Sequence, residues 1–299
     1  MARPEMKLLK ERKLTELITP PKGSDVLEAS GVVVKDRDYY VIFDNVRRVA
    51  RIDPGLSPTS KRHGWLGPRL SGGDGYEDIA HSPRLKRFFL LVEAEKHTDG
   101  TYKGLIDECD EAGRLKSRRW IDFVLPKRNT GFEGLAAVRV KGVNYLLALC
   151  EGNRCKAGRE GKAGGGGRIQ VLARKKAMWV PIAQIKLPST VGFEDYSAVA
   201  LRGDRIAVIS QMTSRLWIGR LRTRNWTIAG KGRIYDFPRT KRGRLKYCTL
   251  EGLSWVSNTT FVMVSDLCKK GYRKGCRKTD QSIHLFALPG TGRQRRKGR

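Results

Sequence analysis

The chain has 299 residues, of which 39% are hydrophobic and 8% aromatic, so its composition supports a folded core and excludes wholesale disorder. Sixty Lys and Arg residues against 30 Asp and Glu give a formal net charge of +30, which attracts polyanions such as nucleic acid or phosphorylated ligands. No apolar run approaches the roughly 20 residues of a membrane-spanning helix, and the first residues lack the apolar core of a secretory signal, which favours a cytoplasmic location.

Five short motifs recur along the chain, each made of an apolar residue, a glutamate and a small or acidic residue. They are Leu27-Glu28-Ala29, Tyr76-Glu77-Asp78, Phe132-Glu133-Gly134, Phe193-Glu194-Asp195 and Leu250-Glu251-Gly252. Successive glutamates are separated by 49, 56, 61 and 57 residues, which fits a four-stranded propeller blade with elaborated loops. The sequence therefore predicts an all-β, five-bladed β-propeller with one Glu motif opening the first strand of each blade.

The remaining strands of each blade are predicted from apolar runs and turn signals. Second strands are expected at 39–43, 88–92, 145–150, 206–209 and 261–264, where β-prone residues follow one another without polar interruption. Third strands are expected at 46–52, 169–173, 216–221 and 283–288. Residues 54–75 are rich in Pro and Gly and predict a loop. No segment has a sustained 3.6-residue period, so helices are not expected.

Three segments that end in proline, at 123–126, 185–188 and 235–238, predict outermost strands that stop where proline removes a ladder donor. The same pattern occurs at 17–20, where no blade precedes it, whereas the fifth blade ends after its third strand. We therefore expect residues 14–18 to pair with 283–288 and to close the last blade, which removes two open sheet edges. Residues 1–290 would form one monomeric propeller domain, and residues 291–299 a disordered basic tail.

Acidic residues are predicted to gather at one end of the central channel. In a four-stranded meander the first strand begins on the face where the second strand ends. The glutamates at the starts of the first strands and the acids at the ends of the second strands should therefore converge on that face. The predicted metal ligands are Glu28, Glu77, Glu133, Glu194 and Glu251, with a second tier of Asp44, Glu93, Glu151, Asp266, Asp78 and Asp195. Oxygen ligands in a roomy site suit Ca²⁺, with Mg²⁺ as the alternative. A competing interpretation is that each glutamate braces backbone N–H groups of the neighbouring blade and holds no metal.

The longest basic loops are expected on the same face. Candidate polyanion-binding residues are Lys269, Lys270, Arg273, Lys274, Arg277, Arg154, Lys156, Arg159, Lys241 and Arg242. A basic rim around an acidic centre suits a phosphorylated ligand, with a cation in the middle and Lys and Arg on the phosphates. The alternative is that these residues are ordinary solvated loop charges.

Six cysteines are too few for a disulfide scaffold in a chain of this length. Cys150 and Cys155 flank one loop, and Cys268 and Cys276 flank another, so local disulfides would form in an oxidising compartment. Free thiols are the expected state.

The sequences Glu133-Gly134-Leu135-Ala136, Glu251-Gly252-Leu253-Ser254 and Glu77-Asp78-Ile79-Ala80 resemble the E-G-[IL] blade motif of the SdiA-regulated and esterase-like phytase propeller families. Those families commonly have six or more blades, whereas five are predicted here. The resemblance implies channel-facing acidic residues, often a bound Ca²⁺, and phosphoester substrates.

Three hypotheses follow for the function. The first is a cation-binding propeller, with Ca²⁺ as the expected ion, that recognises a polyanionic or phosphorylated partner. The second is a metal-dependent phosphoester hydrolase of the phytase or esterase-like kind. The third is a non-catalytic interaction platform whose glutamates only brace the blades.

Overall fold

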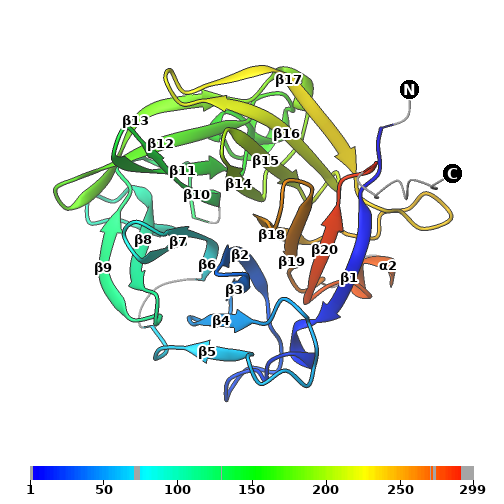
Figure 1. The fold of residues 1–299 in the computed structure, drawn as a ribbon. Helices are drawn as coiled ribbons and strands as arrows, with labels where there is room; N and C mark the ends of the chain where they lie inside the picture. Colours follow the sequence, from blue (N-terminus) through cyan, green and yellow to red (C-terminus); the bar gives the residue numbers. More distant parts are fainter. Residues whose placement is uncertain (1–2, 71–74, 129, 270, 272–273, 291–299) are drawn as a thin grey trace, which may run out of the picture.

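The structure is a computed structural model that describes residues 3–70, 75–128, 130–269, 271 and 274–290. Its strands form five antiparallel sheets of four strands each, arranged as blades around a central channel (Figure 1). This confirms the predicted five-bladed all-β propeller. Within the described ranges, no helix has the length and apolar character needed to cross a bilayer.

Each blade is a meander that runs outward from the channel. Blade 1 contains β2 (Ala29–Lys35), β3 (Asp38–Phe43), β4 (Val49–Ile52) and β5 (Gly64–Leu66). Blade 2 contains β6 (Tyr76–Ser82), β7 (Arg87–Lys96), β8 (Tyr102–Asp110) and β9 (Leu115–Trp120). Blade 3 contains β10 (Phe132–Val140), β11 (Val143–Cys150), β12 (Arg168–Lys175) and β13 (Met178–Lys186). Blade 4 contains β14 (Ala198–Arg202), β15 (Arg205–Ser210), β16 (Arg215–Arg222) and β17 (Thr227–Asp236). Blade 5 contains β18 (Leu250–Trp255), β19 (Thr260–Ser265), β20 (Ser282–Ala287) and the N-terminal β1 (Lys7–Lys13).

Short helical turns interrupt the loops between strands. They are η1 (Leu14–Glu16), η2 (Asn153–Cys155), α1 (Gly158–Lys162), η3 (Ser189–Val191) and α2 (Lys274–Arg277). Two of them, η2 and α1, lie in the long loop of blade 3 between β11 and β12, and α2 lies in the corresponding loop of blade 5.

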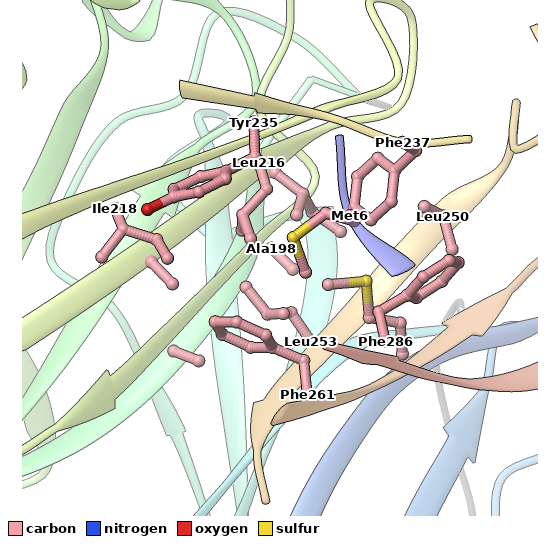
Figure 2. Close-up of a cluster of buried hydrophobic side chains, with 14 of the residues drawn as sticks. Met6, Ala198, Leu216, Ile218, Tyr235, Phe237, Leu250, Leu253, Phe261 and Phe286 are labelled. Atoms are coloured by element: carbon pink, nitrogen blue, oxygen red, sulfur yellow. The ribbon is translucent and has the colours of Figure 1, made fainter. Parts of the chain in front are cut away.

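The hydrophobic core is divided among the interfaces between neighbouring blades. Figure 2 shows Leu216 and Ile218 of blade 4 beside Leu253 and Phe261 of blade 5, with Met6 from the N-terminal segment in the same cluster. The second strands are buried on both faces because they contact the blades on each side, which explains their uninterrupted apolar sequences.

The N-terminal strand closes the ring, as predicted, but it uses different residues from those expected. β1 (Lys7–Lys13) pairs antiparallel with β20, from Lys7 opposite Ala287 to Lys13 opposite Ser282. Residues 14–18 do not form a strand, since Leu14–Glu16 is a 3-10 turn. Leu14, Leu17 and Ile18 are buried beside blade 1 instead. The outer strand was hard to predict because its charged side chains face solvent.

Two further strands lie where the sequence did not indicate them. β5 (Gly64–Leu66), the fourth strand of blade 1, lies inside the segment 54–75 that was expected to be a loop. The fourth strand of blade 2 is β9 (Leu115–Trp120), which precedes the segment 123–126 expected to form it. Arginines of β9 pair with acids of β8, so its polar sequence satisfies buried charges rather than marking a loop.

The cysteines also differ from expectation. Two disulfides are present, Cys150–Cys155 and Cys248–Cys276, so the expectation of free thiols is wrong for these four residues. Cys276 pairs with Cys248 rather than with Cys268 because α2 lies against the segment that leads into β18. Cys109 and Cys268 are free and buried.

Candidate functional site

The Glu motif of three blades is a β-bulge at the start of the first strand. In blade 3, Phe132 lies opposite Cys150 and Gly134 opposite Leu149, so Glu133 is the extra residue. In blade 5, Leu250 lies opposite Ser265 and Gly252 opposite Val264, which makes Glu251 the extra residue. The ladder of blade 2 is interrupted in the same way across Glu77 and Asp78. A bulge redirects the side chain of the extra residue, so Glu77, Glu133 and Glu251 share one structural position.

Serines occupy the equivalent position in blades 1 and 4. The bulge of blade 1 falls at Ser30, since Ala29 lies opposite Phe43 and Gly31 opposite Ile42. The Ser30 hydroxyl donates to the carbonyl of Tyr76 in blade 2, and the Ser197 hydroxyl of blade 4 donates to the carbonyl of Leu250 in blade 5 at 2.9 Å. Both acceptors are the apolar residue of the next blade's motif. Blades 1 and 4 therefore carry a hydroxyl where the others carry a carboxylate.

The two remaining motif glutamates are consequently displaced from the ring that the repeat alignment predicted. Glu28 lies two residues before Ser30, in the loop that leads into β2, where its backbone N–H donates to the Asn45 side chain at 3.1 Å. Glu194 lies three residues before Ser197 and is exposed to solvent. The predicted equivalence of the five glutamates is therefore wrong in blades 1 and 4.

A group of carboxylates nevertheless gathers at the channel mouth, and we call it the acid cluster: Glu28, Asp44, Glu133, Glu251 and Asp266. Burial raises the pKa of Glu251 well above its ordinary value, and the charges of Asp266, Glu133 and Asp44 raise it further. Burial also raises the pKa of Asp266 to about 7, and Glu28 and Asp44 add to this effect. The mutual effects on pKa place these side chains within electrostatic reach of one another.

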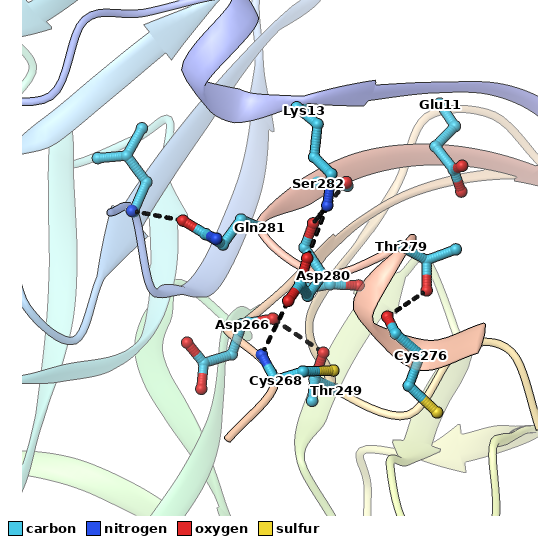
Figure 3. A network of polar contacts seen from close by, with 12 residues as sticks. Glu11, Lys13, Thr249, Asp266, Cys268, Cys276, Thr279, Asp280, Gln281 and Ser282 are labelled. Atoms are coloured by element: carbon cyan, nitrogen blue, oxygen red, sulfur yellow. Dashed lines mark hydrogen bonds and ion pairs between the residues drawn. The ribbon is translucent and has the colours of Figure 1, made fainter. Parts of the chain in front are cut away.

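Asp266 lies at the edge of a polar network in which Asp280 joins blade 5 to the N-terminal strand β1 (Figure 3). Its backbone N–H donates to the Thr249 carbonyl at 2.9 Å, and its carbonyl accepts from the Thr249 hydroxyl at 2.9 Å. Nearby, Asp280 accepts from the Cys268 backbone N–H at 3.1 Å and from Lys13 of the β1 strand at 2.6 Å. In contrast, Asp266 Oδ1 is buried and has no hydrogen-bond partner in the described part of the chain.

Two features shape the surroundings of the acid cluster. A Cβ atom on Gly75 would lie only 1.6 Å from Asp44 Oδ1, so glycine is required there for the carboxylate to approach the backbone of blade 2. Lys269 lies close enough to lower the pKa of Glu28, Glu251 and Asp266. Deeper in the channel, a small cavity of about 80 Å³ is lined mainly by apolar residues of the first strands, such as Ile79, Leu135 and Val199. The lining of this cavity includes His81 but none of the residues of the acid cluster.

The raised pKa values make the stability of the ligand-free fold depend on pH. Asp266 has an ordinary pKa of 3.8 and a folded pKa of about 7, so between these values the folded protein binds more protons than the unfolded chain. The free energy of unfolding contributed by this group therefore falls as the pH rises through that window. His284 has the opposite effect, because burial lowers its pKa from 6.5 and acidification favours the unfolded chain.

Other acidic residues of the predicted second tier accept hydrogen bonds from nearby backbone and hydroxyl groups and do not belong to the acid cluster. Asp78 is buried, and its two oxygens accept the backbone N–H groups of Ile79 at 2.8 Å and of Leu135 in blade 3 at 2.7 Å. Asp195 accepts from the Ser210 hydroxyl and the Met212 backbone N–H. The contact with Leu135 favours the bracing interpretation for Asp78, whereas Asp195 is held within its own blade. The side chain of Glu93 lies outside the described residues.

Glu151 belongs to a second group, away from the acid cluster. Burial raises its pKa, as does the charge of Asp195, while Lys127 and Lys162 lower it. The structure therefore divides the predicted single ring of carboxylates into two groups. One lies at the channel mouth, and the other lies between blades 3 and 4.

The predicted basic residues lie on exposed loops wherever the structure describes their side chains. These are Lys269, Arg277, Arg154, Lys156, Arg159, Lys241 and Arg242. Lys270, Arg273 and the predicted tail 291–299 lie outside the described residues, as does the side chain of Lys274. Within the described residues, no three His, Cys, Asp or Glu side chains form a ready-made metal site.

Comparison with known proteins supports the fold and does not assign a family. No protein-family model and no curated protein matches the sequence, so the resemblance to the SdiA-regulated and phytase-like families has no support there. Among solved structures, glutaminyl cyclase of Myxococcus xanthus is similar with a TM-score of 0.56 and 11% identity, over 96% of this chain and 98% of that one. A protein of unknown function from Bacteroides caccae has a TM-score of 0.52 and 11% identity, over 94% and 89%. At such identities the similarity concerns the propeller fold alone.

Proposed function

We propose that the propeller binds a divalent cation at the acid cluster, with Ca²⁺ as the expected ion, and binds a polyanionic partner through the basic loops around it. The observation that carries the cation site is the convergence of Glu251 and Asp266 with their acidic neighbours, together with the buried Asp266 Oδ1 that has no partner among the described residues. At ~5 Å and an effective dielectric constant of about 20, two ionised carboxylates repel by roughly 3 kcal/mol. A bound cation would remove this repulsion and satisfy the buried oxygen.

The chemistry of the donors favours Ca²⁺ over transition metals. The acid cluster offers carboxylate oxygens, which suit hard cations, and Ca²⁺ tolerates irregular geometry and variable ligand number. Because the carboxylates are not already arranged as a metal site, we expect side-chain rotation on binding and a modest affinity. Glu28, Asp44, Glu133, Glu251 and Asp266 are the proposed ligands.

Ca²⁺ is expected to stabilise the protein, and to do so more at about pH 8 than at about pH 5, where protons already occupy Asp266. At a concentration 100 times Kd, binding to the folded state alone contributes about 2.7 kcal/mol. Thermal unfolding in EDTA, Ca²⁺ and Mg²⁺ at the two pH values measures this. Glu251→Gln and Asp266→Asn should each remove most of the Ca²⁺ response. Asp266→Asn should also be more stable than the wild type at the higher pH in EDTA.

Glu194→Gln is the matched control for this experiment. It alters a glutamate of the same sequence motif, but Glu194 is exposed and outside the acid cluster. Its Ca²⁺ response should equal that of the wild type. If neither Ca²⁺ nor EDTA changes the melting temperature while Glu251→Gln destabilises the fold, the glutamates only brace the blades and the proposed cation site is wrong.

The basic loops are expected to set the salt dependence of polyanion binding. Reversing the charges of Lys241, Arg242 and Lys269 should flatten the slope of log K against log salt on duplex DNA, by about 0.9 for each phosphate that the variant no longer neutralises. The control reverses Lys175, Lys176 and Arg224, which are exposed on hairpins between third and fourth strands and so on the opposite face. Equal changes in the two variants would reduce the binding to a general effect of the +30 charge.

A further inference from the structure

A cleft of about 280 Å³ lies between blades 3 and 4, apart from the acid cluster. Its walls come from the segment before β10, the long loop between β11 and β12, and the segments that follow η3 and β15. The charged lining residues are Lys127, Glu151, Lys156, Lys162, Glu194 and Asp195, and Met212 contributes an apolar side chain. A cavity of this size is at the small end of those that hold ligands.

The loop that forms one wall of the cleft is held in place by buried contacts. Asn153 is fully buried, and its amide donates to the carbonyls of Gly161 at 2.8 Å and of Phe193 at 3.1 Å. Its side-chain oxygen accepts from the Gly166 backbone N–H at 2.7 Å and from the Tyr196 hydroxyl at 2.9 Å. The Cys150–Cys155 disulfide fixes the start of the same loop. The cleft is therefore formed before any ligand arrives.

The cleft presents charges of both signs that the protein leaves unpaired. The Glu151 carboxylate is only partly exposed, and it has no hydrogen bond or ion pair with any described residue. Burial raises the pKa of both Glu151 and Asp195. The positive charges of Lys127 and Lys162 lower the pKa of Glu151, but they do not cancel the effect of burial. The ammonium groups of Lys127, Lys156 and Lys162 likewise make no ion pair within the described part of the chain. A partly desolvated, unpaired carboxylate beside exposed, unpaired ammonium groups is complementary to a ligand that carries both charges.

We propose that this cleft is a binding site for a small zwitterion that carries a primary ammonium group and a carboxylate. The ammonium group would bind Glu151, supported by Asp195, and the carboxylate would bind the lysines. An aliphatic part would lie against Met212. The site is separate from the acid cluster and does not depend on the proposed cation.

Isothermal titration calorimetry with L-norleucine tests the site, with pentylamine and hexanoate as half-ligands. Pentylamine lacks only the carboxylate and hexanoate lacks only the amine, so each should bind at least about tenfold more weakly than norleucine. Glu151→Gln should weaken norleucine by about tenfold or more, since a charge-assisted hydrogen bond is lost. Met212→Trp alters no charge but fills the cleft, and it should abolish binding if Glu151→Gln proves too unstable to measure.

The controls separate this site from the rest of the molecule. Glu160→Gln changes an exposed acid of α1, and Lys175→Gln changes an exposed lysine on the opposite face; neither residue lines the cleft, and both variants should bind norleucine as the wild type does. Glu151→Gln should keep the Ca²⁺ response, and Asp266→Asn should keep norleucine binding. No binding of norleucine to the wild type at tens of millimolar would overturn the proposal. So would hexanoate or inorganic phosphate binding as tightly as norleucine.

Discussion

Deletion of residues 1–13 is expected to lower the free energy of unfolding by several kcal/mol and to make the protein aggregate. β1 (Lys7–Lys13) completes blade 5, so its removal exposes the edge of β20 and the apolar surface that Met6 covers. It also removes Glu11, which accepts a hydrogen bond from buried His284 at 2.9 Å. Urea unfolding and size-exclusion chromatography measure the two effects.

A synthetic peptide of residues 1–16 supplies the control for this deletion. Added in trans, it should restore part of the stability, whereas a peptide of the same composition in scrambled order should not. A truncated protein that unfolds at the same urea concentration as the full chain would contradict the closure of blade 5 by β1.

Asp107→Ala is expected to destabilise the fold by about 3–5 kcal/mol, because it leaves buried positive charge without a partner. Asp107 is completely buried in β8. It accepts two hydrogen bonds from Arg118, at 2.6 and 2.7 Å, and one from the Tyr76 hydroxyl at 2.9 Å. Arg47 of blade 1 approaches it at 3.4 Å and lies over the Tyr76 ring. The network therefore links two blades, and urea unfolding measures its loss.

Asp204→Ala is the matched control for the buried network. Asp204 also pairs with an arginine, Arg220, at 2.6 Å, but both side chains are more than half exposed. Exposed ion pairs contribute about 0–1 kcal/mol. Similar losses in the free energy of unfolding of the two variants would show that the burial of Asp107 does not determine how strongly its removal destabilises the fold.

The number and order of the blades could be predicted because the second strands are buried on both faces. A strand such as β19 (Thr260–Ser265) must be apolar along its centre, from Phe261 to Val264, and this signal does not depend on the loops around it. The outer strands gave no such signal. β9 (Leu115–Trp120) contains two arginines that pair with acids of β8, and β1 contains four basic residues, so both read as polar segments.

The candidate site could be predicted only in part, because the Glu motif does not fix the register of the first strand. Alignment on the glutamates matched Glu28 with Glu133 and Glu251, whereas the bulge matches Ser30 with them. The glycines of the first strands indicate the register better than the glutamates do. Gly31, Gly134 and Gly252 each pack so closely against a neighbouring first strand that an added Cβ would lie within 3 Å of its backbone. Alignment on these glycines would have identified Ser30.

The pairing of β1 with β20 also has a consequence for synthesis on the ribosome. The residues of β1 leave the exit tunnel long before Ser282–Ala287, so their hydrogen bonds to β20 cannot form until those residues have emerged. Blades 1 to 4 can form in order as the chain lengthens, but the N-terminal strand stays unpaired throughout. Its sequence, Lys-Leu-Leu-Lys-Glu-Arg-Lys, is rich in charge, which disfavours association with strands of neighbouring nascent chains during that interval. The pairing of β1 with β20 thus comes after the formation of the blades between them.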